Sequence, residues 1–375
     1  MTARRTRCLA VLPLFTLLAG CSIGDIRRSA PAPEPPQVTA TPAPTTTPVA
    51  ETRTTRLAVP QRYAPPFVEF VDAENGYALF AACDDQTPAS DCPALLWSTR
   101  DGGRSWQQLR HPQPDTTPQR DGDVQQLYTA EGILALYAPQ VGWWTSTDRG
   151  DTFRRTPGEA PPRAWQAAQG RFQLIESSGK VGRWTGRTLR PLPVQPKLPV
   201  VQSVVETDWQ FSSKESSGPL VAAGADDDGR PYVAISVDEG RSWRPTPVEF
   251  DGAVGVLRVV RAQSELWLVG ERPDRTGFPA VWRHGPAWER MPDEGHPETG
   301  QVVPLGFGVA AVVGPRGAGA LIGSGYVDLP WPLTDEHHLR MLPDNTLVAT
   351  GPQSVLLGTG HAGDRTWKAV IIETE

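Results

Sequence analysis

The eight residues TRDGGRSW (Thr99–Trp106) form a motif that is repeated twice along the chain, as STDRGDTF (Ser146–Phe153) and SVDEGRSW (Ser236–Trp243). Each copy begins with a hydroxyl residue, has an Asp two positions later and a Gly two positions after that, and ends on an aromatic residue. The hydroxyl and carboxylate oxygens can accept hydrogen bonds from nearby backbone N–H groups, and Gly tolerates a positive φ. Each copy therefore predicts a tight turn between two strands, closed over by its aromatic side chain.

The spacing of these turns predicts how many units the chain contains. The three final aromatic residues are 47 and 90 positions apart, and 90 is twice 45, so one degenerate unit is expected between the second and third copies. The intact copies also share a tail, in which the large residue is followed three positions later by an apolar residue or Thr. Four more tails begin at Leu189, Trp288, Tyr326 and Trp367.

Seven units over residues 60–375 give about 45 residues each, which is enough for four short strands. We therefore predict an all-β fold: a seven-bladed β-propeller of four-stranded antiparallel blades.

Composition agrees with this fold and excludes two other classes of protein. The chain has 39 Pro among 375 residues, and each interior Pro costs a helix about 3 kcal/mol, so a helical bundle is excluded. The formal net charge of -6 and the pI of about 5.6 argue against a phosphate-backbone partner. No nucleic acid is expected.

The repeated turn resembles the Asp-box, or BNR repeat, of sialidase-like β-propellers. In those proteins the motif joins the third and fourth strands of a blade, on the face away from the active site. The resemblance implies a structural role for the motif residues. These are Thr99, Asp101, Gly103, Trp106, Ser146, Asp148, Gly150, Phe153, Ser236, Asp238, Gly240 and Trp243.

Residues 1–20 have the layout of a secretory signal peptide: three arginines, no acid, and then the apolar run Cys8–Leu18. The run leads into Leu18-Ala-Gly-Cys21, which resembles the lipobox of bacterial lipoproteins, where the Cys is acylated and the chain is cut before it. The resemblance implies a palmitate-type lipid on Cys21, an extracytoplasmic location and contact with the cell membrane through the lipid anchor only. An ordinary signal peptide with a chance Cys is the alternative. The Arg4-Arg5 pair leaves twin-arginine export open beside the general secretory route.

Residues 21–59 are predicted to be a disordered linker that carries the lipid. The segment is rich in Pro, Thr and Ala and has no periodic apolar face, so it cannot bury enough surface to offset its ordering entropy. An extended polyproline geometry spans about 3.1 Å per residue. Such a linker would hold the domain away from the bilayer.

The remaining cysteines, Cys83 and Cys92, flank a predicted hairpin loop whose ends must approach. In an exported protein this favours a disulfide; free thiols or a metal pair are the alternatives, although two thiols without a nearby His make a poor zinc site. The acidic run Asp226–Asp228 lacks the alternate spacing and closing Glu of a calcium loop, so we expect a polar turn. No metal or cofactor is expected.

Two function classes remain open. A sialidase-like exo-glycoside hydrolase needs an arginine triad, a Tyr/Glu nucleophile pair and an acidic proton donor, and its aromatic-Arg-Ile-Pro signature is absent. The stretch FVDAENGYA (Phe70–Ala78) resembles the opening of a blade in photosystem-assembly-factor propellers, which implies a non-catalytic role. We therefore expect a binding or scaffold propeller for a protein or carbohydrate ligand, with the hydrolase as the alternative.

The predicted turns also indicate which face binds. In a four-stranded blade, the turn between strands two and three emerges on the face opposite the Asp-box turns. The longer insertions fall there, and variable loops on a rigid scaffold are where recognition tends to be found. We expect ligand contacts on this face, first at Glu271, Arg272, Asp274 and Arg275; solvated hairpin tips are the alternative interpretation.

Overall fold

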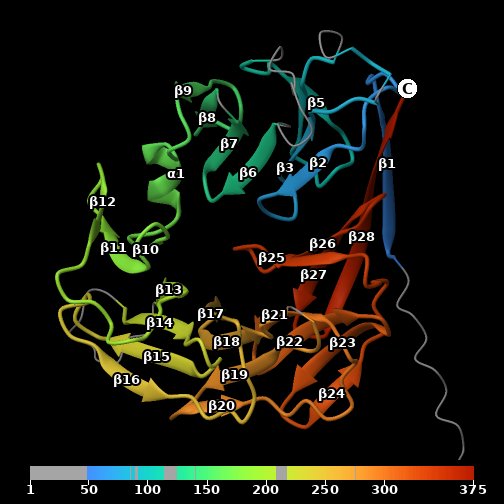
Figure 1. The fold of residues 1–375 in the computed structure, drawn as a ribbon. Coiled ribbons are helices and arrows are strands. Elements are labelled where there is room, and N and C mark those ends of the chain that lie inside the picture. The colour runs from blue at the N-terminus through green and yellow to red at the C-terminus, as the bar shows by residue number, and fades with distance from the viewer. Residues whose placement is uncertain are drawn as a thin grey trace, which may run out of the picture. The chain divides into compact units, whose positions relative to one another are not determined.

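The computed structural model describes residues 49–84, 86–88, 92–113, 125–139, 141–207, 218–274 and 276–375. The predicted signal peptide and Cys21 therefore lie outside the described residues. The described chain folds into seven successive small β-sheets, each with its first strand toward the centre and its last strand outside (Figure 1). The prediction of an all-β, seven-bladed propeller is confirmed. Among the described residues, no helix is long and apolar enough to span a bilayer.

Within each blade the strands follow one another in chain order from the centre outward, except that β1 lies at the outer edge of blade 7. Blade 1 contains β2 (Phe67–Phe70), β3 (Gly76–Phe80), β4 (Leu95–Thr99) and β5 (Gln107–Leu109), and blade 2 contains β6 (Gln126–Ala130), β7 (Ile133–Ala138), β8 (Gly142–Ser146) and β9 (Arg154–Thr156). Blade 3 contains β10 (Phe172–Ile175), β11 (Lys180–Trp184) and β12 (Leu189–Pro191), and blade 4 contains β13 (Ser203–Glu206), β14 (Leu220–Ala225), β15 (Pro231–Ser236) and β16 (Arg244–Pro247). Blade 5 contains β17 (Val256–Ala262), β18 (Glu265–Glu271), β19 (Ala280–His284) and β20 (Trp288–Arg290), and blade 6 contains β21 (Gln301–Gly306), β22 (Val309–Gly314), β23 (Gly317–Ile322) and β24 (Gly325–Asp328). Blade 7 contains β25 (His338–Met341), β26 (Leu347–Thr350), β27 (Val355–His361) and β28 (Asp364–Thr374), with β1 (Glu51–Leu57) added outside β28.

Two blades depart from the predicted four strands. Blade 3 has three, and the helix α1 (Arg163–Ala168) lies just before it in the chain. The helix sequence RAWQAA is rich in good helix formers and has no alternation of apolar and polar residues. Blade 7 has five strands, because β1 pairs in parallel with β28 from Glu51 opposite Lys368 to Leu57 opposite Thr374.

Strand β1 corrects the predicted domain boundary at residue 60. The segment from Glu51 to Leu57 falls within the predicted linker of residues 21–59, yet it belongs to the sheet of blade 7. Its sequence, ETRTTRL, contains one apolar residue, and this Leu57 and the following Val59 are buried. The predicted boundary is wrong because β1 pairs with a strand more than 300 residues away, a partner that no local pattern reveals.

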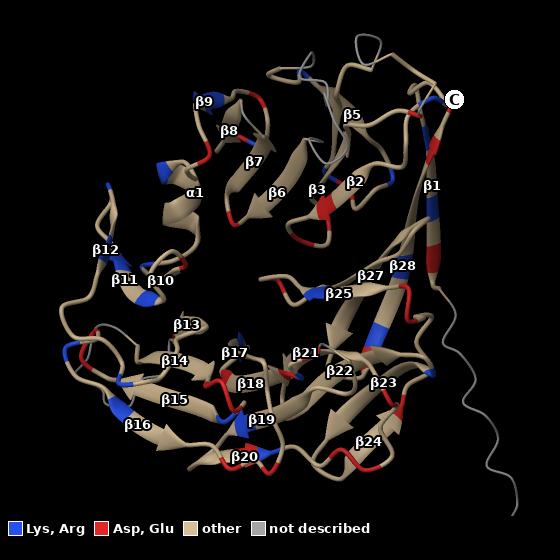
Figure 2. Ribbon diagram, in the orientation of Figure 1, with Lys and Arg blue, Asp and Glu red and all other residues tan. Residues whose placement is uncertain are grey.

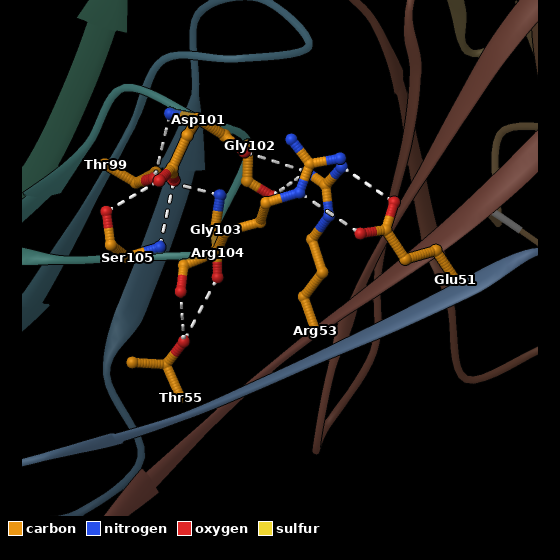
Figure 3. A network of polar contacts seen from close by, with 9 residues as sticks. All are labelled: Glu51, Arg53, Thr55, Thr99, Asp101, Gly102, Gly103, Arg104 and Ser105. Carbon is orange, nitrogen blue, oxygen red and sulfur yellow. Dashed lines mark hydrogen bonds and ion pairs between the residues drawn. The ribbon is translucent and has the colours of Figure 1, made fainter.

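Arg53 of β1 joins the two ends of the ring of blades. Its side chain is buried, and its guanidinium donates hydrogen bonds to the carbonyl oxygens of Asp101 and Gly102, at 3.0 and 2.6 Å, in the Asp-box turn of blade 1 (Figure 3). The same group donates to the carboxylate of Glu51 at 2.8 Å, which lowers the pKa of Glu51 to about 2. Strand β1 thus completes blade 7 and clamps it to blade 1.

Neighbouring blades pack through apolar clusters between their faces. Strand β14, for example, is buried at all six residues; Val221 on one side of it packs toward Leu257 of blade 5, while Leu220 lies in the cluster with Val181 of blade 3. The positions of Lys, Arg, Asp and Glu along the chain fall mostly on turns and outer strands, as Figure 2 shows. The core is therefore a ring of inter-blade layers.

The junction between blades 2 and 3 is built differently. Among the described residues, none of the apolar clusters joins these two blades. Instead, an aromatic group covers this face of blade 2: the rings of Tyr137 and Trp143 lie 4.6 Å apart, and Trp165 of α1 stacks on Trp143 at 6.4 Å. The helix packs against β7 of blade 2 and comes in the chain where the first strand of blade 3 is expected.

Candidate binding face

The three Asp-box turns use their polar groups internally, in the same way each time. Thr99, Ser146 and Ser236 accept hydrogen bonds from the N–H of the box glycine at 2.9, 2.7 and 2.8 Å. The Asp carboxylates accept from the N–H of Ser105, Thr152 and Ser242 at 3.0, 2.9 and 2.8 Å. In the second box, hydrogen bonds from Thr152 and Ser146 lower the pKa of Asp148 to about 2. These carboxylates are committed to the turns.

Each Asp-box turn also fastens its blade to the preceding one. A Cβ placed on Gly150 would lie 2.5 Å from Cδ1 of Leu109 in blade 1, and one on Gly240 would lie 2.4 Å from Cδ1 of Leu192 in blade 3. Gly103 meets Val370 of blade 7 in the same way, at 2.6 Å. The three partners are tail residues of the preceding unit. The Asp-box residues are therefore placed between blades, with their aromatic members half-buried.

The opposite face, which we call the binding face, consists of the turns between second and third strands and the connections from one blade to the next. Three hollows among the described residues open on it. The first, the seam groove, lies where blade 7 meets blade 1 and has a volume of 580 Å³. Its lining residues are Arg56, Tyr63, Pro65, Pro66, Val68, residues 350–355 and residues 370–374.

The other two hollows adjoin each other across blades 5, 6 and 7. The larger, of 390 Å³, is polar and is lined by the run Asp335–His338 together with the ends of β21 and β22. The smaller, of 170 Å³, is lined by Arg258, Glu271 and Arg272, and the two share Gly277, Gly300 and Gln301. We call the pair the polar hollow.

The four residues predicted for binding have different positions. Glu271 and Arg272 line the polar hollow, where the carboxylate of Glu271 accepts a hydrogen bond from Arg258 at 2.7 Å. Asp274 instead accepts from the N–H and hydroxyl of Thr276, at 2.9 and 2.6 Å, and these bonds lower its pKa. Arg275 lies outside the described residues. The structure thus brings two of the four together in one hollow and commits a third to its own turn.

Sequence reasoning missed part of this face. The run Asp335-Glu336-His337-His338 lines the polar hollow, and its density of titratable groups was a local signal that could have found it. The seam groove had no such signal, because its walls come from residues near the two ends of the chain.

The disulfide between Cys83 and Cys92 is present, with their Cα atoms 6.0 Å apart, and closes a loop on the binding face. The acidic turn at Asp226 on the same face is held by its own backbone: the carboxylate accepts from the N–H of Asp228 and Arg230 at 3.0 and 2.9 Å. In the part of the chain that the structure describes, no group of three or more His, Cys, Asp or Glu residues is placed to hold a metal ion.

Three arginines on or near the innermost strands are already paired with carboxylates. Arg258 pairs with Glu271, Arg340 with Glu69, and Arg171 with Glu206 and Glu239. A sialidase-like site needs three arginines that converge on one substrate carboxylate. These three instead belong to four ion pairs, and the three arginines lie on different blades.

No protein-family model matches the chain, and no curated protein matches it. Several solved structures are similar in fold. The structure of YCF48 bound to D1 peptide is 14% identical, with 82% of this chain and 93% of that chain covered, at a TM-score of 0.40. YCF48 from Cyanidioschyzon merolae is 12% identical, with 82% and 96% covered, at a TM-score of 0.43.

A sialidase of Trypanosoma rangeli, in complex with the inhibitor DANA, is 14% identical, with 84% of this chain and 55% of that chain covered, at a TM-score of 0.30. Both kinds of propeller that the sequence resembles are thus among the similar structures.

Proposed function

We propose that this protein is a membrane-anchored, extracytoplasmic propeller that binds a protein or carbohydrate ligand on its binding face and does not catalyse a reaction. One observation carries the proposal: the seam groove and the two parts of the polar hollow all open on that face, whereas a further hollow, of 770 Å³, lies along the outer strand β16 beside the Asp-box residue Trp243 and has no acidic side chain in its lining. In the Asp-box turns, in contrast, the hydroxyl and carboxylate groups are hydrogen-bonded to the backbone of the same turn. Arg258, Arg340 and Arg171, on or near the innermost strands, are each paired with a carboxylate, which suits recognition better than acid–base chemistry.

The entry point of the chain supports this orientation. The N–H of Ala50 bonds to the carbonyl of Trp367 at 2.8 Å, close to where β28 begins after the turn from β27. That turn joins the third and fourth strands of blade 7, so β1 begins on the Asp-box face and runs toward the binding face. A tether attached at the start of β1 leaves the binding face free for a ligand.

The binding face is tested by photo-cross-linking in membranes of the producing cell. A benzophenone amino acid replaces Arg272 or Gln353 on the binding face, and matched variants carry it at the exposed Thr147 or Arg241 in the Asp-box turns. We expect adducts from the first pair alone. Adducts from the Asp-box positions, or hydrolysis of fluorogenic sialosides or other glycosides by the purified protein, would contradict the proposal.

The anchor is tested by the substitution Cys21→Ser. Without the thiol there is nothing to acylate, so we expect the protein to leave the membrane fraction. Mass spectrometry of the mature wild-type protein is the direct check, and an N-terminal residue without lipid would refute this part of the proposal.

A further inference from the structure

Strand β28 is longer than the strand beside it. Its last ladder pair with β27 is Val370 opposite Val355, whereas β28 continues to Thr374. The chain before Val355 turns away through a bond from the N–H of Gly351 to the carbonyl of Ser354 at 2.9 Å. The final four residues of β28 therefore have a strand partner, β1, on one side only.

The backbone hydrogen bonds show which residues face the open side. The carbonyl of Trp367 accepts from Ala50, and the N–H of Glu375 donates to the carbonyl of Val59 at 3.0 Å, so odd-numbered residues of β28 bond toward β1. Alternate residues of a strand bond in opposite directions. Ile372 and Thr374 therefore point their N–H and C=O groups away from β1, and no described residue bonds to these four groups.

This free edge forms one wall of the seam groove. Residues 370–374 line it together with the turn at residues 350–355, and Tyr63, Pro65 and Pro66 stand on the side of blade 1. Only two of its lining residues are ionised, Arg56 and Glu373, and they pair with each other at 3.1 Å. The groove therefore offers four unused backbone groups and no unbalanced charge.

We propose that the seam groove binds an extended, uncharged peptide segment of a partner protein, which adds to β28 as a short strand beside Ile372 and Thr374. This mode of recognition joins main-chain hydrogen bonds along a free edge to apolar contacts with alternate side chains. The neutral, largely apolar lining matches a segment without charged residues. The inference rests on the proposed function, because it names the ligand class of one site on the binding face.

Two other occupants fit the edge less well. Residues 29–48 of this chain contain seven prolines, and Pro has no N–H to give to a ladder. A second copy would have to bring its own edge between the turn at residues 350–355 and the segment with Pro65 and Pro66, which wall the groove on both sides. A single extended peptide needs no such space.

The experiment selects 12-residue peptides from a random phage-displayed library on the full-length protein, purified in detergent, and measures the affinity of the selected peptides. Ile372→Pro removes the N–H that faces the groove and leaves the neighbouring bonds to β1 in place, a position at which an edge strand tolerates Pro. Ile372→Val is the matched control, because it trims the side chain and keeps the N–H. Thermal melts show whether each variant stays folded.

We expect Ile372→Pro to weaken peptide binding about tenfold or more, since it leaves a peptide carbonyl unpaired in the groove, while Ile372→Val keeps the affinity. If Ile372→Pro fails to fold, backbone N-methylation of the peptide replaces it. Methyl groups on one set of alternate residues should then abolish binding, and those on the other set should not.

Each other outcome overturns the inference. Peptides that bind Ile372→Pro and wild type equally would contact another site on the binding face, so that the proposed function would stand without this groove. A failure to select any peptide would exclude the groove as a peptide site. A dimer in sedimentation that Ile372→Pro converts to a monomer would make a second copy the occupant.

Discussion

Arg53 is the residue on which the junction of blades 7 and 1 most depends. Its guanidinium serves two backbone carbonyls and Glu51 in a buried position. We expect Arg53→Ala to lower the free energy of unfolding by about 2–4 kcal/mol, because the carbonyls of Asp101 and Gly102 lose their partner without regaining water. Urea denaturation measures the loss.

Arg56, three residues further along β1, is the matched control. Its ion pair with Glu373 is exposed, with side-chain exposures of 68% and 46%. Arg56→Ala should therefore change the stability by less than about 0.5 kcal/mol. Equal losses for the two variants would show that the buried bonds of Arg53 do not hold the junction.

His111 makes the fold sensitive to mild acid. Burial lowers the pKa of His111 to about 4, partly offset by hydrogen bonds with Gln125 and Gln113. In the unfolded chain the ring takes up a proton near pH 6.5, so the stability present above that pH is lost as the pH falls from about 6.5 toward 4. We expect the urea midpoint to fall over this range and the decline to be smaller in His111→Asn. An unchanged decline in His111→Asn would contradict the assignment.

At the scale of the element, the Asp-box turn acts as a connector between blades. Gly240 has a φ of +81°, and Leu192 of the preceding blade occupies the space where a Cβ would lie. We expect Gly240→Ala to destabilise through both backbone strain of about 1–2 kcal/mol and displacement of Leu192. Gly132 separates the two effects, because its φ is +70° but open space surrounds it.

Gly132→Ala should therefore lower the melting temperature by the strain alone, and Gly240→Ala by clearly more. The difference between the two variants measures the contact with Leu192. Equal shifts would mean that the box glycine is selected for its φ and not for the junction.

The same turn explains how much of the fold could be predicted from sequence. The box and the tail are local patterns that sequence alone reveals. The tails also identify contact residues, because the glycine of the following box packs against a tail residue: Leu109, Leu192 or Val370. The absence of one strand from blade 3 could not be predicted, because the tail at Leu189 is intact. The helix α1 comes in the chain where the other strand was expected. Strand β1 was hidden because its pairing partner is supplied by the other end of the chain.

At the scale of the whole molecule, the binding sites depend on which blades become neighbours. Glu271 and Arg272 could be predicted from one long turn. The polar hollow needs the run Asp335–His338 from two blades further along the chain. The seam groove needs the last residues of β28 to lie beside the segment with Pro65, which happens only when the ring closes. Local patterns in the sequence predicted which face binds. The hollows on that face depend on which blades become neighbours when the ring closes.

Ring closure itself can be tested by moving the start of the chain. A protein that begins at residue 49 keeps β1, whereas one that begins at residue 60 loses it. The shorter chain leaves the outer backbone edge of β28 without a partner along seven residue pairs and strips the carbonyls of Asp101 and Gly102 of Arg53. An unpaired edge of this length is also a template for association between chains.

We therefore expect the chain that begins at residue 49 to unfold at the same urea concentration as the mature protein. The chain that begins at residue 60 should unfold at a clearly lower concentration and form larger species in size-exclusion chromatography. Adding Arg53→Ala to the longer chain should give part of the same loss, because it removes the clamp and keeps the strand pairing. Equal urea midpoints for the two truncated chains would place the start of the folded domain at residue 60 after all, and would reduce β1 to a strand that docks on a ring already closed without it.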